Sequence, residues 1–238
     1  MAKTMDRRER RRQATVEEIK DTARQQIAES GAANFSMGAV ARAMGMTPPA
    51  LYRYFENRDA LLADLVIEAY DSMGEAMETA LEGLPENDHA GRYLALMSAY
   101  RTWGLARPEA LGLMYGASGT DVDLSEEQLE RFQNAVMRST WAMVQVLWAA
   151  HKAGRLVVPS QYHEPPATVR FALDWMHTIL PAQDVPLGIL VLALTTWIRA
   201  DGLVRQELHG YLPKGLFGDG DFFEMESRVL AEWLGLAR

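Results

Sequence analysis

The chain has 238 residues, no cysteine and a formal net charge of −8. This length is enough to bury a sizeable core and to form two domains. Because cysteine is absent, a disulfide framework and a thiolate metal site are both excluded.

Charge is distributed unevenly along the chain. Residues 1–58 contain eleven lysines and arginines against seven acidic residues, a net charge of +4. Residues 59–238 contain thirteen basic and twenty-five acidic residues, a net charge of −12. We expect the acidic part to repel a polyanion such as DNA, which leaves the basic end to approach it.

Residues 1–14 form the most basic segment, with one lysine and five arginines against two acidic residues. The segment has no apolar face to bury, so we predict a disordered basic arm. It either lies along DNA phosphates or in a minor groove, or it is a solvated tail. No apolar stretch follows it, which argues against a secretory signal peptide.

A first helix is predicted over residues 15–30. Thr15 opens the capping-box pattern T-V-E-E, and Gly31 follows the predicted end. The apolar positions of this helix repeat every four residues: Ile19, Ala23 and Ile27.

A second, short helix and a tight turn are predicted next. Ser36 can cap this helix, and Val40 and Ala41 should face inward. Gly45 fits the left-handed conformation that commonly ends a helix.

A third helix begins after Thr47, which we expect to cap it. Pro48 and Pro49 suit the first helical turn, where missing amide hydrogens cost nothing. Leu51 and Phe55 share one face and should pack inward. The residues on or near the open face are Ala50, Tyr52, Arg53 and Tyr54.

Two short helices joined by a tight turn are typical of a helix-turn-helix, whose second helix enters the major groove of DNA. The prolines and Ala50 can touch thymine methyls, and the hydroxyls and guanidinium can bind phosphates or base edges. The alternative is a small helical bundle with two core tyrosines. Asn57 should cap the following helix, which carries Arg58 at its start.

The rest of the chain is helical in pattern, without alternating strand segments. Further helices are predicted to about residue 81 and over residues 91–107, 109–115, 125–152, 167–180, 187–209 and 221–234, with a loop at residues 116–123. The longest apolar stretch, residues 185–198, is interrupted by Pro186 and Gly188. We expect it to be too short to span a bilayer and to form a buried helix.

The fold class is therefore all-α. We predict a helix-turn-helix domain at residues 15–58 and a larger helical domain at residues 59–238.

Residues 35–62, FSMGAVARAMGMTPPALYRYFENRDALL, resemble the tetracycline-repressor (TetR) family of bacterial regulators. The likeness lies in the hydroxyl-bearing helix start, the glycine turn, the Leu-Tyr and aromatic-Phe pairs, and the acidic-Ala-Leu-Leu segment. It implies phosphate contacts by Ser36, Thr47, Tyr52 and Arg58. It implies contacts to bases or the flanking backbone by Pro48, Pro49, Ala50, Arg53 and Tyr54.

Two positions depart from the family pattern. Gly38 stands where members often carry a polar reader, and Met37, a further candidate DNA contact, replaces a common hydroxyl residue. Base reading should therefore rest on the second short helix. Farther on, Trp197, Gly202 and LVRQELHGYLP resemble a C-terminal subtype named for a Trp-His-Gly signature, with Asp201 at the histidine position.

The resemblance implies a cytoplasmic, nucleoid-associated homodimer. Its two helix-turn-helix domains would occupy successive major grooves of a palindromic operator. Residues 59–238 would form an effector-binding and dimerisation domain, which we call the body. A small apolar effector would bind there, tilt the helix at residues 59–81 and release DNA. Repression is the family default, and no cofactor is implied.

The body is rich in methionine and tryptophan, which suits a pocket for an apolar ligand. Plain core packing would give the same composition. The candidate pocket residues are Trp103, Tyr115, Trp141, Gln145, Trp175 and His177.

The last two predicted helices carry more apolar surface than a terminal pair buries within one subunit. We expect them to form a four-helix interface with a second copy; the alternative is that they cover the subunit's own core. The candidate interface residues are Leu190, Leu194, Trp197, Ile198, Val229, Leu230 and Trp233.

Other functional classes receive less support. The histidines show no metal-ligand spacing, and neither a Gly-x-Ser-x-Gly motif nor a phosphate-binding glycine loop occurs, so we expect no catalysis and no metal site. An architectural DNA-binding protein without an effector stays an alternative, because a filled core would have the same sequence.

Overall fold

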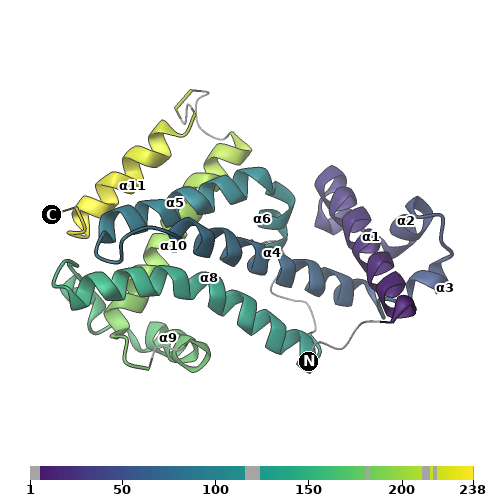
Figure 1. Cartoon of the computed structure of the whole chain (residues 1–238), viewed down its shortest axis with the longest axis horizontal. Helices are drawn as coiled ribbons and strands as arrows, with labels where there is room; N and C mark the ends of the chain where they lie inside the picture. Colours follow the sequence, from purple (N-terminus) through teal and green to yellow (C-terminus); the bar gives the residue numbers. More distant parts are fainter. Residues whose placement is uncertain (1–5, 116–123, 181–182, 211–214, 217–218, 238) are drawn as a thin grey trace. The chain divides into compact units, whose positions relative to one another are not determined.

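The computed structural model describes residues 6–115, 124–180, 183–210, 215–216 and 219–237, apart from the side chains of residues 172, 175 and 179. All regular elements in these ranges are helices, which confirms the predicted all-α class (Figure 1). The residues of the chain pack into two compact units, each with most of its contacts inside itself. The head unit comprises residues 1–69 and 107–132, and the body unit comprises residues 70–106 and 133–238.

The head unit begins with three helices and a single 3-10 turn, and continues into parts of later helices. Its first elements are α1 (Arg7–Ser30), η1 (Ala32–Asn34), α2 (Met37–Ala43) and α3 (Pro48–Leu51). The first part of α4 (Arg58–Leu81), α6 (Pro108–Tyr115) and the start of α8 (Glu126–Lys152) complete it.

The observed division differs from the predicted boundary between residues 58 and 59. The first three turns of α4 belong to the head unit, as do α6 and the start of α8. Leu61 and Leu62 are fully buried, so the apolar core continues past residue 58 without a break. Both α4 and α8 run from one unit into the other.

The helix α1 begins at Arg7, eight residues before the predicted start. The prediction of a disordered arm is therefore wrong for residues 7–14. This stretch contains no glycine or proline and is rich in strong helix formers, so the helix continues through Thr15. The Thr15 hydroxyl does not cap a helix but donates to the carbonyl of Arg11 at 3.0 Å.

The apolar faces predicted for the head are confirmed. The helix α1 packs against α2 and α6, and α2 packs against α3. The predicted core residues are all buried: Ile19, Ala23, Ile27, Val40, Ala41, Leu51 and Phe55.

The body unit contains the later parts of α4 and α8 and several further helices. These are α5 (His89–Ala106), η2 (Ser160–Tyr162), α9 (Ala167–Ile179), α10 (Leu187–His209) and α11 (Asp221–Trp233). The helix α5 packs against both α10 and α11, and α10 also contacts α9 and η2. The predicted bounds of α5, α8, α9, α10 and α11 are confirmed to within two residues; the predicted loop at residues 116–123 lies outside the described residues.

The helix α10 is longer than the apolar stretch from which its nature was predicted. By length and composition alone its 23 residues could cross a membrane, whereas the expectation concerned the shorter apolar stretch at residues 185–198. Half of the most apolar 18-residue segment of α10 is nevertheless buried inside the protein, and Ile189 and Leu190 are fully buried. These contacts are those of a core helix.

Candidate nucleic-acid interface

The turn between α2 and α3 is fixed by a cap at one end of α2 and a left-handed glycine at the other. The Ser36 Oγ accepts a hydrogen bond from the Ala39 amide at 3.2 Å, which confirms the predicted cap. Gly45 has a φ angle of +65°, also as predicted. The Met46 amide donates to the carbonyl of Ala41 at 2.8 Å, the backbone bond of a Schellman motif.

We call residues 47–54 the recognition segment. The helix α3 itself ends at Leu51, but the Phe55 amide donates to the Leu51 carbonyl at 3.3 Å, so helical hydrogen bonding extends farther. Buried Leu51 and Phe55 anchor the segment to the head. The side chains of Thr47, Pro48, Pro49, Tyr52 and Arg53 are exposed, and those of Ala50 and Tyr54 are half-buried.

The exposed side of the recognition segment combines hydroxyls, flat apolar rings and one cation. Tyr52 is 49% exposed, and Arg53 beside it is also exposed. Thr47 stands at the N-cap position, but its side chain makes no cap hydrogen bond, so its predicted capping role is wrong. Its hydroxyl can instead turn toward a phosphate. These groups suit contacts to the DNA backbone and to base edges.

Two residues predicted to contact DNA instead make contacts within the head unit. Met37 is only 5% exposed, because this apolar side chain in the first turn of α2 packs into the core. Its predicted role as a DNA contact is therefore wrong. Arg58 donates from Nη2 to the carbonyl of Ala32 at 2.7 Å and from Nε to that of Phe35 at 3.3 Å. The geometry gives Arg58 a role in joining α4 to the segment before α2, and does not support a phosphate contact.

The start of α4 and a partly buried ion cluster hold the head unit together. The Asn57 side chain caps α4 as predicted, accepting a hydrogen bond from the Ala60 amide at 2.8 Å. On α1, Lys20 is 6% exposed and pairs with Glu68 of α4, which also pairs with Arg24.

The Lys20 ammonium is stabilised in its charged form. Burial lowers its pKa, but the hydrogen bonds and charges of Glu68 and Glu17 outweigh burial and raise the pKa above 10.5. This cluster was not predicted from the sequence, although a lysine next to Ile19 on the predicted apolar face of α1 could have indicated it.

The structure does not gather the predicted ligand-pocket residues around one described groove. Trp103 is buried and donates from Nε1 to the Ser72 hydroxyl at 3.0 Å. Gln145 is exposed, and Tyr115 belongs to the head unit and is 36% exposed. Neither position supports a place in an enclosed pocket of the body.

The remaining candidate pocket residues stay predictions. Trp141 is half-buried on α8. His177 is half-buried, with its Nε2 atom 3.1 Å from the carbonyl oxygen of Val185. The side chain of Trp175 lies outside the described residues.

A polar cluster in the body joins α5 to α10. The Asp201 carboxylate accepts a hydrogen bond from the Tyr100 hydroxyl at 2.9 Å and a bifurcated one from Nε of Arg205, at 2.8 Å to Oδ2 and 3.0 Å to Oδ1. The Tyr100 ring lies 4.7 Å from the ring of Trp197, centre to centre. Burial, with the charge of Asp201, raises the pKa of Tyr70. Asp201, the residue that departs from the Trp-His-Gly signature, therefore acts as a structural anchor.

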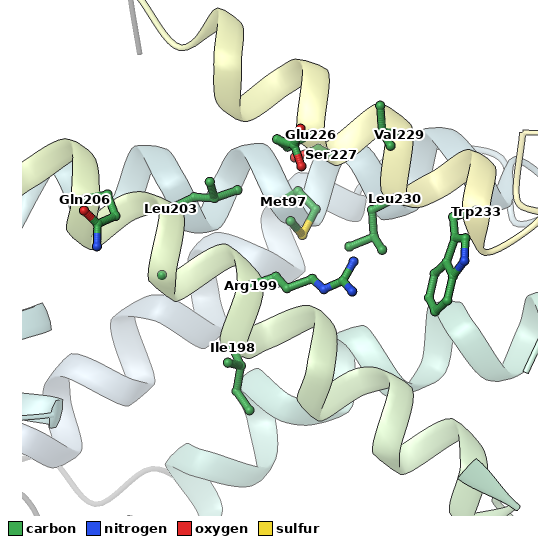
Figure 2. A pocket seen from close by; sticks show the side chains of 11 residues that line it. Met97, Ile198, Arg199, Leu203, Gln206, Glu226, Ser227, Val229, Leu230 and Trp233 are labelled. Carbon is green, nitrogen blue, oxygen red and sulfur yellow. The ribbon is translucent and has the colours of Figure 1, made fainter. Parts of the chain in front are cut away.

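A groove of about 750 Å³ lies on the body between α10 and α11, with Met97 of α5 also lining it (Figure 2). The Arg199 guanidinium lies over the Trp233 ring, 5.6 Å from its centre. Four predicted interface residues line this groove: Ile198, Val229, Leu230 and Trp233. Three of them, Ile198, Val229 and Trp233, are at least half exposed in the single subunit.

Not all the predicted interface residues lie on the surface. Leu190 is fully buried within the subunit, so its predicted place in a dimer interface is wrong. The helix α10 is apolar on more than one side, and the side that carries Leu190 faces the subunit's own core. Leu230 is 7% exposed at the groove, Trp197 is half-buried beside Tyr100, and Leu194 is 41% exposed.

Two family models match the chain. The model for "Bacterial regulatory proteins, tetR family" matches residues 19–65, which include the glycine turn and the recognition segment. The model for "Tetracyclin repressor-like, C-terminal domain" matches residues 93–230, more than half of the chain. The chain belongs to the TetR family. This TetR-family protein is a DNA-binding transcriptional regulator.

Related proteins support the same assignment over nearly the whole length. HTH-type transcriptional regulator Mb1846 of Mycobacterium bovis is 24% identical over 225 residues, 94% of this chain and 93% of the relative. The fold is similar to that of the crystal structure of SCO4313, with a TM-score of 0.72, 28% identity, and 96% and 100% of the two chains covered. It is also similar to that of FadR from Bacillus subtilis, with a TM-score of 0.57, 15% identity, and 92% and 96% covered. The Trp-His-Gly subtype stays a prediction.

Proposed function

We propose that this TetR-family protein is a homodimeric repressor that leaves a palindromic operator when a small apolar molecule binds its body unit. The observation that carries the proposal is the recognition segment, where exposed Tyr52 and Arg53 follow paired prolines on a segment anchored by Leu51 and Phe55. A short helix presented in this way fits the major groove.

The homodimer is supported by the groove between α10 and α11. Ile198, Val229 and Trp233 expose apolar surface there, which a second copy related by two-fold symmetry would cover. Such a dimer places two identical heads on one duplex, and operator half-sites about 34–36 Å apart then match the protein's symmetry.

An apolar effector is supported by the residues of the body and by one relative. Buried Tyr93, Met97, Trp103 and Met143 give the body unit a polarizable aromatic and thioether interior. The solved structure of FadR from Bacillus subtilis, which shares the fold, is a complex with stearoyl-CoA. Because α4 runs from the body unit into the head unit, a shift of its body end can reach the recognition segment.

The proposed partner is chromosomal DNA in a bacterium, so the site of action is the cytoplasm, at the nucleoid. The relatives are named as transcriptional regulators, and we propose no catalytic activity for this chain.

A mobility-shift assay with DNA that flanks the protein's own coding sequence tests the DNA-binding part. Wild-type protein should bind saturably, and binding should weaken as salt rises. The double variant Tyr52→Ala/Arg53→Ala should lose at least about tenfold in affinity for this DNA, since both side chains face the duplex. Gln25→Ala, an exposed change on α1, is the control. Unchanged affinity of the double variant would contradict the proposal.

Tryptophan fluorescence tests the effector part. Acyl-CoA esters and other apolar molecules should quench or shift the emission, and the same molecules should release bound DNA. A library that changes neither the emission nor DNA binding would favour an architectural protein that works without an effector.

A further inference from the structure

The start of α1 carries a run of arginines outside the region that the N-terminal family model matches. That model begins at residue 19, whereas α1 begins at Arg7. Residues 7–12 contain five arginines and one glutamate, and all six side chains are exposed. We call residues 7–12 the arginine extension.

The arginine extension is part of one continuous helix, so the position of its side chains is set by the rest of α1. Arg12 lies four residues before Val16 and seven before the buried Ile19, on the face that packs against the head. Arg8 lies one turn farther out on the same side. Arg10 is two residues from Arg12, about 200° around the helix, and therefore points the other way.

One contact joins this face to the recognition segment. The Arg12 guanidinium carbon lies 5.9 Å from the centre of the Tyr54 ring. Figure 1 likewise shows the dark-purple start of α1 on the side of the head where α3 lies. The Arg12 contact therefore brings this face of α1 against the recognition segment at Tyr54.

The arginine extension is unfavourable for the isolated helix. Arg7 and Arg11, and Arg8 and Arg12, are like charges four residues apart, which weakens a helix. Within the described part of the chain, neither Arg8 nor Arg12 forms an ion pair with a carboxylate. An anion outside the chain would relieve this repulsion, and a guanidinium binds phosphate through two parallel hydrogen bonds.

We propose that Arg8 and Arg12 bind phosphates of the same duplex that the recognition segment enters, extending the DNA-binding surface along α1. This inference rests on the proposed function. Such contacts are independent of base sequence, so they add affinity for any duplex and leave the preference for the operator unchanged.

The test is fluorescence anisotropy with full-length protein over a series of salt concentrations. The probes are a duplex of about 30 base pairs from the DNA that flanks the coding sequence and a scrambled duplex of equal length. Arg8→Ala/Arg12→Ala should bind both probes about tenfold more weakly, and the plot of log affinity against log salt should become shallower by about two for each head.

Arg7→Ala/Arg10→Ala is the matched control, because it removes the same charge from other sides of the helix. It should weaken binding by less than about threefold, with a change in slope below one for each head. Circular dichroism should show that both variants keep the wild-type helix content, since alanine favours a helix.

Two results would overturn the inference: equal losses in the two double variants, or wild-type binding by Arg8→Ala/Arg12→Ala. These are distinguishable from failure of the proposed function. The ratio of affinities for the two probes should survive in Arg8→Ala/Arg12→Ala and vanish in Tyr52→Ala/Arg53→Ala. A wild-type protein that binds both probes equally would contradict the proposed function itself.

Discussion

Arg58 donates two hydrogen bonds to backbone carbonyls before α2, and its guanidinium lies 5.7 Å from the centre of the Phe35 ring. We predict that Arg58→Ala lowers the free energy of unfolding by about 1–2 kcal/mol, because two acceptors lose a charged donor that is 38% exposed. Chemical denaturation followed by circular dichroism measures this. Arg53→Ala, which alters an exposed side chain, should change the same quantity by less than about 0.5 kcal/mol. Equal effects of the two changes would show that Arg58 is not a structural residue.

Lys20 makes stability depend on pH in the alkaline range. Its pKa is higher in the folded protein than in the unfolded chain, so its contribution is complete below about pH 10.5 and is lost as pH rises through the folded pKa. We predict that the difference in unfolding free energy between the wild type and Lys20→Met is constant from about pH 7 to 9.5 and shrinks above about pH 10.5. Urea denaturation at a series of pH values measures it. A difference that grows with pH would contradict the assignment.

At the scale of elements, the turn between α2 and α3 depends on Gly45. An alanine there would have to keep a φ angle of +65°, so we predict that Gly45→Ala lowers the free energy of unfolding by about 1 kcal/mol. Gly38 lies in the helical part of α2, and an added Cβ would meet Arg42 Nη1 at an ordinary 3.7 Å. Gly38→Ala should therefore be neutral or stabilise by up to about 1 kcal/mol. Thermal unfolding of the two variants, each measured beside the wild type, gives their relative stabilities. A Gly45→Ala variant as stable as Gly38→Ala would refute the role of Gly45 in the turn.

Local patterns predicted the helices of this protein because their signals lie within a few residues. The caps at Ser36 and Asn57 and the turn at Gly45 were found from the residue itself and its neighbours. At Thr15 two local signals conflicted, and the helix propensity of the arginines before it prevailed over the capping box.

Long-range contacts were beyond the reach of these patterns. The carbonyls that Arg58 binds lie more than twenty residues earlier in the chain, and Lys20 pairs with a glutamate forty-eight residues later. On α10 the spacing could not separate Leu190, which faces the subunit's own core, from Ile198, which is 60% exposed. A helix that is apolar on several sides gives no indication of which side a second copy covers.

At the scale of the whole molecule, the groove between α10 and α11 predicts the oligomeric state. Ile198→Glu/Val229→Glu would put two carboxylates into the proposed apolar interface, where each is costly to bury. We predict that the wild type sediments as a dimer at micromolar concentration and that this variant sediments as a monomer. Phe171→Glu, a change at an 80% exposed residue of α9 that does not line the groove, should leave the dimer intact. A dimeric Ile198→Glu/Val229→Glu would place the interface elsewhere.

We propose that the recognition segment reads DNA as one half of a symmetric dimer. Selection of duplexes from a random-sequence library by the purified full-length protein tests this proposal. We predict that one inverted repeat is enriched, with half-sites about one helical turn apart or a small multiple of it, and that Tyr52→Ala/Arg53→Ala enriches none. Enrichment of a single unrepeated site, the same repeat selected by the double variant, or no enrichment by the wild type would contradict it.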